Sequence, residues 1–195
     1  MKKLMTAAMA ILIACTSCKK DLLIGNGPVA TELRFATGFT QVKVSGKTNV
    51  TINYGTTFKV EVRAYRNLIP ALETKVNGEV LTIGYESGTS VSNDNSEVFI
   101  TMPLLTKFST TGDSKININS GTADHFEARL TGASKIEGLG FTAKNADITI
   151  EGTGTASFAV VDTLKAKITG SGIIYYRGDP SVSSIIVGNG KVEKL

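Results

Sequence analysis

Apolar and polar residues alternate along most of the chain from Phe39 onward. Alternating segments at 42–44, 50–54 and 58–62 are separated by short polar or glycine-containing turns. A period of two residues is typical of strands that bury one face, whereas a helix repeats its apolar positions every three or four residues. Since no segment after residue 30 has a helical period, the sequence predicts an all-β protein.

The second half of the chain contains an internal repeat built around a glycine. Successive repeat glycines are separated by 20 or 18 residues, and they are Gly112, Gly132, Gly152, Gly170 and Gly188. A fixed period near twenty indicates stacked structural units. Glycine at the same phase of each unit allows a sharp bend with a positive φ. We therefore expect these five glycines to be structural corners.

Apolar residues upstream of each glycine repeat with the same period. Phe126, Ala146 and Leu164 begin three equivalent alternating segments. Such residues would form inward columns when the units stack. The pattern predicts a right-handed parallel β-helix, or β-solenoid, with coils of about 18–20 residues. The N-terminal strands would extend or cap this stack. The alternative is an antiparallel sandwich whose glycine turns coincide by chance.

The N-terminus has the features of an export signal. Lys2 and Lys3 precede an apolar run over 4–14, which is shorter than the roughly 20 residues of a bilayer-spanning helix. The residues around Cys15 and Cys18 resemble a bacterial lipobox, in which a cysteine thiol receives a lipid. The preceding residues favour Cys15 and the charged residues that follow favour Cys18, so both are candidates for lipidation.

These features divide the chain into three parts. We expect a lipoprotein signal peptide over 1–17, a tether over 18–33 and a single β-solenoid domain over 34–195. Glycine and proline within 25–28 disfavour regular structure in the tether. The lipid would anchor an exported protein to the outer membrane, at the cell surface or on the periplasmic face. An ordinary secretory peptide with incidental cysteines is the alternative.

Composition limits the partners and cofactors that the chain could use. Its formal charge of +4 falls to +2 once Lys2 and Lys3 leave with the signal peptide. No stripe of lysine and arginine is present, so we expect no nucleic-acid partner. One histidine and two cysteines are too few for a Cys/His metal cluster. We expect neither a metal nor another cofactor.

Candidate catalytic residues are few. His125 is the only histidine of the sequence and lies beside Asp124, so any catalytic triad would have to include it. Glu137, Glu151 and Asp113 lie near the repeat glycines and are the carboxylates that a polysaccharide-active enzyme would use. Carboxylates on the surface of a repeat protein are usually solvated. We therefore expect no enzymatic activity.

The densest aromatic cluster lies near the C-terminus. Tyr175 and Tyr176 are adjacent and are followed by Arg177. Tyrosine rings can stack on sugars, so these three residues are candidate ligand contacts. Alternation would place one tyrosine in the core and the other on the surface. The absence of tryptophan from the sequence weakens the case for a sugar site.

The order of the motifs resembles that of a known family. The motifs are Val42-x-Val44-Ser45-Gly46, Val76-Asn77-Gly78, Met102-Pro103, Ile168-Thr169-Gly170-Ser171-Gly172 and Tyr176-Arg177-Gly178-Asp179-Pro180. Over roughly residues 34–192 the chain resembles the auto-transporter adhesin head GIN domain, a domain of unknown function in exported Gram-negative lipoproteins. The resemblance implies a β-solenoid at the cell surface and brings no catalytic residues.

The sequence as a whole favours a non-enzymatic adhesin or binding module of the cell envelope. A lipid would anchor it to the membrane, and its solenoid would meet a polar partner such as a glycan or another envelope protein. Two alternatives remain open. One is a polysaccharide-active enzyme on a β-helix, and the other is a structural envelope protein that associates with itself through its ends or faces.

Overall fold

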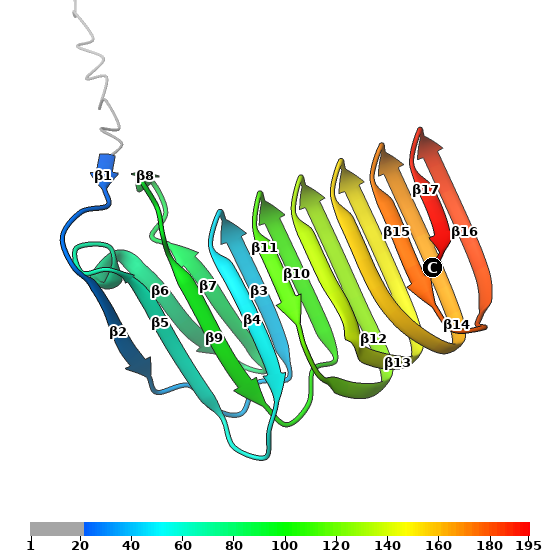
Figure 1. Cartoon of the computed structure of the whole chain (residues 1–195), viewed down its shortest axis with the longest axis horizontal. Coiled ribbons are helices and arrows are strands. Elements are labelled where there is room, and N and C mark those ends of the chain that lie inside the picture. The colour runs from blue at the N-terminus through cyan, green and yellow to red at the C-terminus, as the bar shows by residue number, and fades with distance from the viewer. Residues whose placement is uncertain (1–21) are drawn as a thin grey trace, which may run out of the picture.

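The computed structural model of the chain describes residues 22–195 (Figure 1). The signal peptide expected over 1–17 and both lipidation candidates, Cys15 and Cys18, lie outside these described residues. The described residues form seventeen strands and one short 3-10 helix, η1 (Ile69–Ala71). Within this part of the chain, no helix is long and apolar enough to cross a membrane.

The longest strands, β12 to β14, lie in the second half of the chain. The first nine strands have three to seven residues each: β1 (Leu22–Ile24), β2 (Val29–Arg34), β3 (Gln41–Gly46), β4 (Asn49–Tyr54), β5 (Lys59–Tyr65), β6 (Leu72–Asn77), β7 (Val80–Tyr85), β8 (Ser90–Ser92) and β9 (Glu97–Met102). The others have up to 18 residues: β10 (Lys107–Gly112), β11 (Lys115–Ile118), β12 (Gly121–Gly132), β13 (Lys135–Gly152), β14 (Thr155–Gly170), β15 (Ile173–Arg177), β16 (Ser181–Gly188) and β17 (Lys191–Lys194). The all-β prediction is confirmed.

Fifteen strands form one mixed sheet, while β1 and β8 form a separate parallel pair. The order in the large sheet is β2-β5-β9-β4-β11-β13-β12-β10-β3-β7-β6, and β14 to β17 attach beyond β13. Strand β13 pairs with β11 through Lys135–Glu137 and with β12 through Phe141–Gly152. The sheet therefore folds back at β13, and its two arms enclose the core in a nearly closed, barrel-like arrangement (Figure 1).

The prediction of a right-handed parallel β-helix is wrong, because the sheet is mixed. The pairs β2–β5, β5–β9 and β6–β7 are antiparallel. Two residues, Gly78 and Glu79, join β6 to β7, and so short a turn can connect only antiparallel strands. Strand β9 pairs with both β4 and β5 and thereby separates them. The first half lacks the twenty-residue period, so its strands pair by a different scheme from those of the second half.

The repeat of the second half appears as in-register parallel pairing. Strands β3, β10, β12, β13, β14 and β16 follow one another across one arm. Their terminal glycines lie opposite one another from strand to strand: Gly46, Gly112, Gly132, Gly152, Gly170 and Gly188. The repeat period is thus the number of residues in the sequence between two positions that lie opposite each other on neighbouring strands of the second half.

Gly152 shows why glycine is needed at these positions. Its φ is +128°, and an added Cβ would lie 2.4 Å from the carbonyl oxygen of Gly132 in the neighbouring strand. That oxygen accepts a hydrogen bond of 3.0 Å from the backbone N–H of Thr153. A side chain would therefore strain the backbone and collide with a backbone acceptor that is already engaged.

The core is filled by the inward-facing residue of every second position. Three phenylalanines form its aromatic centre: Phe126 on β12, Phe141 on β13 and Phe158 on β14, all fully buried or nearly so. The Phe126 ring centroid lies 4.8 Å from that of Phe141 and 5.0 Å from that of Phe158, with tilted planes. This cluster packs three consecutive strands together.

The segment expected as a tether over 18–33 contains β1 and β2 in its described part. Strand β1 pairs with β8, and β2 pairs with β5. The side-chain amide of Asn93 donates a 2.7 Å hydrogen bond to the carbonyl oxygen of Gly25, between the two strands. Glycine and proline form a bend between β1 and β2. The two strands on either side of the bend are held by β8 and β5, which are distant in sequence. The local composition of the segment does not reveal these partners.

Tyr85, at the end of β7, has a half-buried hydroxyl group. This hydroxyl donates a 2.7 Å hydrogen bond to Oδ1 of Asp94. Burial is the largest cause that raises the pKa of Tyr85 above its ordinary value, and the nearby carboxylate of Asp94 raises it further. The neutral phenol is therefore the form that the folded protein favours.

We expect Tyr85 to make the protein less stable at alkaline pH. Its raised pKa contributes stability that is complete below the unfolded-state value of about 10 and is lost as pH rises further. The free energy of unfolding should be about 1 kcal/mol lower at pH 10.5 than at pH 8. Urea unfolding at pH 8 and pH 10.5 measures it, and Tyr85→Phe should remove this part of the pH dependence. Tyr54→Phe, at an exposed tyrosine, should leave it unchanged; an equal loss in wild type and Tyr85→Phe would contradict the assignment.

Candidate functional site

A row of side chains crosses the outer face of one arm of the sheet. Strand register places Asn117 of β11, Glu137 of β13, Ser157 of β14 and Tyr175 of β15 side by side. Their preceding neighbours in the sequence face the core and are buried: Ile116, Ile136, Ala156 and Ile174. Adjacent strands are about 4.8 Å apart, so the row spans about 14 Å.

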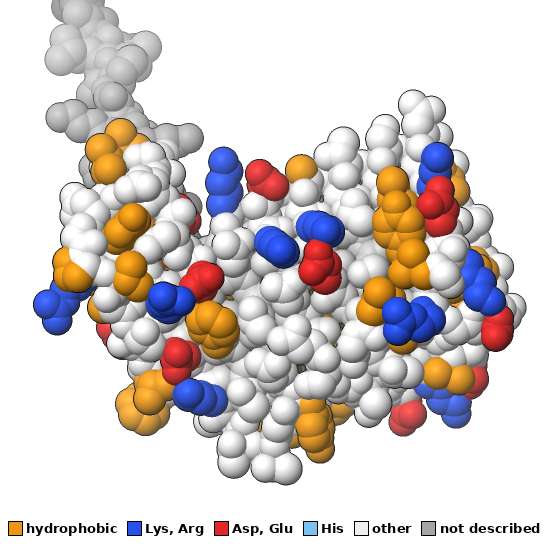
Figure 2. Space-filling model, viewed as in Figure 1, with side chains coloured by type: hydrophobic (Ala, Val, Ile, Leu, Met, Phe, Trp, Pro, Cys, Tyr) orange, Lys and Arg blue, Asp and Glu red, His pale blue; other side chains and the backbone are white. Residues whose placement is uncertain are grey.

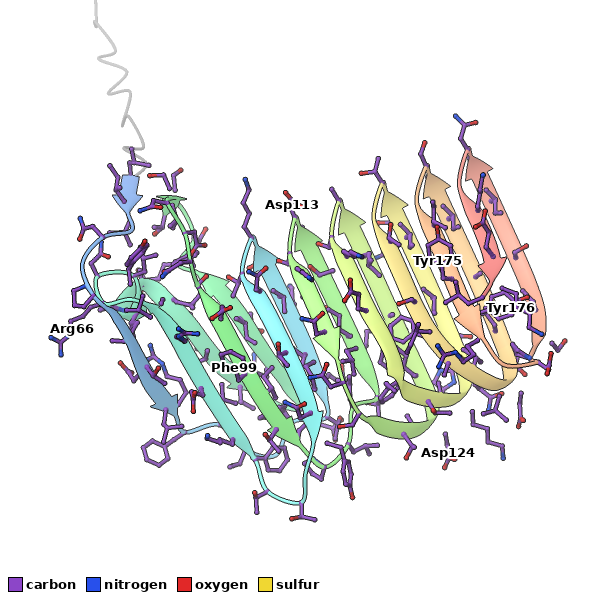
Figure 3. All side chains as sticks on the ribbon, viewed as in Figure 1. Arg66, Phe99, Asp113, Asp124, Tyr175 and Tyr176 are labelled. Atoms are coloured by element: carbon purple, nitrogen blue, oxygen red, sulfur yellow. The ribbon has the colours of Figure 1, made fainter. Side chains whose placement is uncertain are left out.

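This row lines a shallow groove of about 500 Å³. Asn119, Leu139 and Leu195 complete its walls. Figure 3 shows Tyr175 on β15, at the end of the molecule that carries the C-terminus. On this face hydrophobic side chains lie near that end and also near the opposite end, with a largely polar surface between them (Figure 2). The groove therefore combines the apolar side chains of Tyr175, Leu139 and Leu195 with the polar groups of the row.

Glu137 is the charged acceptor of the groove. Nζ of Lys135 lies 2.7 Å from Oε1 of Glu137. The hydrogen bond from Lys135 and its positive charge lower the pKa of Glu137, and the charge of Lys115 on the adjacent strand contributes a little more. Glu137 is consequently ionised at neutral pH and offers only acceptor oxygens.

The groups around the groove suit a ligand rich in hydroxyl groups. The amide of Asn117 can donate and accept hydrogen bonds, and the carboxylate of Glu137 can accept several. The hydroxyl of Ser157 donates to the carbonyl oxygen of Ile136 at 3.3 Å and can accept a hydrogen bond from a ligand. The ring of Tyr175 offers a flat apolar surface with a polar end. A few convergent polar groups beside an apolar wall are the usual makeup of a small-molecule site.

The three predicted ligand contacts are separated by the alternation of β15. Tyr175 lies in the groove. Tyr176 points to the opposite side of the strand, where it is partly buried and packs against the core. Arg177 is exposed at the end of β15 and does not line the groove. The structure thus brings Tyr175 together with Glu137 and leaves the other two candidates elsewhere.

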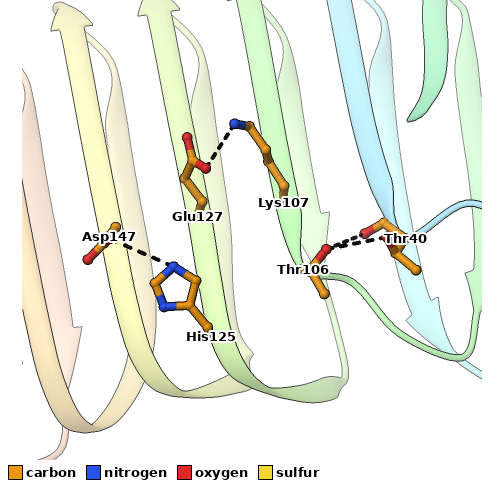
Figure 4. Close-up of polar contacts among 6 residues, drawn as sticks. All are labelled: Thr40, Thr106, Lys107, His125, Glu127 and Asp147. Atoms are coloured by element: carbon orange, nitrogen blue, oxygen red, sulfur yellow. Dashed lines mark hydrogen bonds and ion pairs between the residues drawn. The ribbon is translucent and has the colours of Figure 1, made fainter. Parts of the chain in front are cut away.

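His125, the only histidine of the sequence, contacts a carboxylate of the neighbouring strand at the surface, and a lysine makes a similar contact nearby. Nε2 of His125 lies 3.7 Å from Oδ2 of Asp147 on the next strand, and Nζ of Lys107 lies 2.8 Å from Oε2 of Glu127 (Figure 4). The His125 side chain is 60% exposed. These contacts belong to a solvated ladder on the other arm of the sheet.

The carboxylates considered for an enzyme are not brought together. Glu137 is paired with Lys135, whereas Glu151 is paired with Arg129 on the other arm at 2.6 Å. Asp113 lies in the turn between β10 and β11. Among residues 22–195, no group of three or more His, Cys, Asp or Glu side chains is placed to hold a metal ion.

Four residues of the groove were not predicted from the sequence: Asn117, Asn119, Lys135 and Ser157. A signal was present, since Asn117, Glu137 and Ser157 are spaced by the same twenty residues as the repeat glycines. The twenty-residue period was used to predict the buried apolar columns, but the polar positions between those columns follow the same period. An outward row at a constant phase is the pattern that could have identified the groove.

These features define an all-β domain in which in-register repeats build a mixed sheet with a polar groove on one outer face. The chain belongs to the family described as "Putative auto-transporter adhesin, head GIN domain", whose model matches residues 38–120 and 115–180. The family resemblance seen in the sequence is confirmed. No curated protein is detectably similar to the chain.

Solved structures of several bacterial proteins have a similar fold. A "putative adhesin" from Bacteroides fragilis has a TM-score of 0.60 at 16% identity, over 89% of this chain and 100% of that one. A "putative lipid binding protein" from Parabacteroides distasonis has a TM-score of 0.53 at 18% identity, over 90% and 100% of the two chains. A "putative adhesin" from Parabacteroides merdae has a TM-score of 0.50 at 20% identity, over 90% and 99%. At these identities the likeness shows the fold.

Proposed function

We propose that the chain is an exported, lipid-anchored protein of the cell envelope that acts as a non-enzymatic adhesin and binds a glycan in the groove beside Tyr175. Membership of an adhesin family supports a role at the cell surface or envelope. The basic and apolar N-terminal residues and the lipobox-like cysteines support export and an anchor at Cys15 or Cys18. The outer-membrane location is part of this proposal.

The row from Glu137 to Tyr175 is the observation that carries the glycan assignment. These two residues are two strands apart, a separation of about 10 Å, and the small side chain of Ser157 lies between them. A sugar ring fits over Ser157, with one face toward the phenol ring of Tyr175. Its hydroxyl groups then reach the acceptor oxygens of Glu137 and the donors of Lys135.

A glycan array of the purified full chain tests the proposed function. We expect retention on a subset of glycans, and a roughly tenfold weaker affinity in Tyr175→Ala because an aromatic contact contributes about 1 kcal/mol or more. Glu137→Gln should also weaken retention by removing the charge of the acceptor. Tyr54→Ala is the matched control, since Tyr54 is an exposed tyrosine on β4 outside the groove.

Each other result of the array is informative. Retention that is equal in wild type and Tyr175→Ala would place the ligand elsewhere on the surface. Release of a cleaved product would contradict the non-enzymatic role and would favour the polysaccharide-active alternative. No retention of any glycan would contradict a glycan ligand and would favour a protein partner in the envelope.

A further inference from the structure

The last two strands leave a free edge at one end of the sheet. β16 pairs with β14 and β17 pairs with β15, and within residues 22–195 neither strand has a second partner. The two strands lie one in each arm, at the same end of the molecule (Figure 1). Unpaired N–H and C=O groups along such an edge can hydrogen-bond to a strand of another chain.

Apolar core-facing side chains of β16 and β17 continue the columns of the core. Ile186 lies in register with Ile168, and Val192 lies in register with Ile174, so both continue columns of fully buried residues. Ile186 itself is 41% exposed, and its neighbours Ile185 and Val187 are 62% and 60% exposed. The core therefore ends in an apolar layer that no described residue covers.

The opposite end of the sheet is protected by charge. Its terminal strands are β2 and β6. On β2 the side chains of Arg34 and Glu32 form an ion pair of 3.0 Å, and on β6 Lys75 is paired with Glu73. Charged side chains on an edge strand oppose pairing with another chain. None of the eight residues of β16 is charged, whereas β17 carries Lys191, Glu193 and Lys194. The edge without charged residues is therefore that of β16, in one of the two arms.

We propose that β16 and β17 pair with the same strands of a second copy, joining two molecules end to end. A twofold axis normal to the two arms keeps each arm in its own layer, so β16 meets β16 and β17 meets β17, both antiparallel. This contact uses one self-complementary surface and closes at two molecules. The second copy thereby covers the exposed apolar layer of the first.

The order of the charges on β17 is self-complementary in this antiparallel arrangement. Within one chain, Nζ of Lys191 lies 3.7 Å from Oε1 of Glu193. In an antiparallel pair centred on Val192, each Lys191 also lies opposite Glu193 of the second copy, so that charges of opposite sign face each other across the contact. Ile186 and Val192 lie on opposite sides of the two-residue turn formed by Asn189 and Gly190. Because both residues continue core columns, the proposed axis places Ile186 near its own copy as well, and both columns continue across the contact.

Sedimentation of the full chain carrying Cys15→Ser and Cys18→Ser tests the proposal without a lipid anchor. We expect a dimer of twice the 20.6 kDa chain mass. Ile186→Lys should weaken the dimer at least tenfold, because it places two like charges in an apolar contact. Leu104→Lys introduces the same change at an exposed leucine between β9 and β10 and should leave the dimer intact. Circular dichroism melts verify that both variants fold.

A disulfide trap tests the position of the axis in the same background. Residues opposite one another in an antiparallel pair have Cβ atoms about 4.5–5.5 Å apart, so Val192→Cys should yield a covalent dimer on mild oxidation. Val76→Cys, on the edge strand β6 of the other end, should remain monomeric. A monomer at all concentrations, association beyond the dimer, or cross-linking through position 76 and not 192 would overturn the proposal.

Discussion

Replacing Phe126 with alanine is expected to lower the free energy of unfolding by about 3–5 kcal/mol. The ring is fully buried and makes tilted aromatic contacts with both Phe141 and Phe158. Its removal would leave a cavity where β12, β13 and β14 meet and would remove both aromatic contacts. For a chain of this length the melting temperature should fall by roughly 10 °C, which differential scanning calorimetry measures.

Two control variants separate this effect from a general loss of hydrophobicity. Phe126→Leu keeps most of the buried volume and should cost about 1–2 kcal/mol. Phe35→Ala removes a phenylalanine that is fully solvent-exposed and should leave the melting temperature unchanged. A loss below about 1 kcal/mol in Phe126→Ala would show that the cluster does not hold the three strands together.

The second large effect is expected at Gly152, where alanine should cost about 2–4 kcal/mol. The residue has a φ of +128°, and an added Cβ would approach the carbonyl oxygen of Gly132 to 2.4 Å. Because Gly152 also faces Gly170 on its other side, a shift of its backbone would disturb the pairing with both neighbouring strands. Chemical unfolding followed by circular dichroism measures the loss.

Gly78→Ala is the matched control for this prediction. Gly78 also has a positive φ, +58°, but no atom lies within 4 Å of the position where its Cβ would be placed. Its substitution should therefore cost only the backbone preference, about 1 kcal/mol. Equal losses in the two variants would mean that the close approach between strands does not contribute to the requirement for glycine at position 152.

Much of the secondary structure could be predicted from the sequence, because alternation is a local property. The segments 42–44, 50–54 and 58–62 lie within or overlap β3, β4 and β5, and their core-facing residues are buried. The period of the second half likewise predicted which residues lie opposite one another. It also led to the family resemblance, which the family model confirms.

The candidate site could be predicted only in part. Tyr175 was a candidate ligand contact, and Glu137 was a candidate carboxylate of an enzyme, yet nothing in the sequence indicated that they line one groove. Their proximity depends on β14 lying between β13 and β15. Alternation did predict that Tyr175 and Tyr176 face opposite sides, but which of the two faces the core depends on the register.

The sequence by itself determined most of the strands from Phe39 onward, the phase of the repeat and the buried side of those strands, since each follows from the spacing of residues along the chain. It did not reveal β1 and β2, which lie in the segment expected as a tether. Only the tertiary structure decided that the sheet is mixed, that it folds back at β13, and that β9 separates β4 from β5. An alternating strand presents the same backbone hydrogen-bonding groups to any neighbour, so its own residues do not select a partner. The choice of partner depends on the joint packing of distant side chains in one core, which no local pattern encodes.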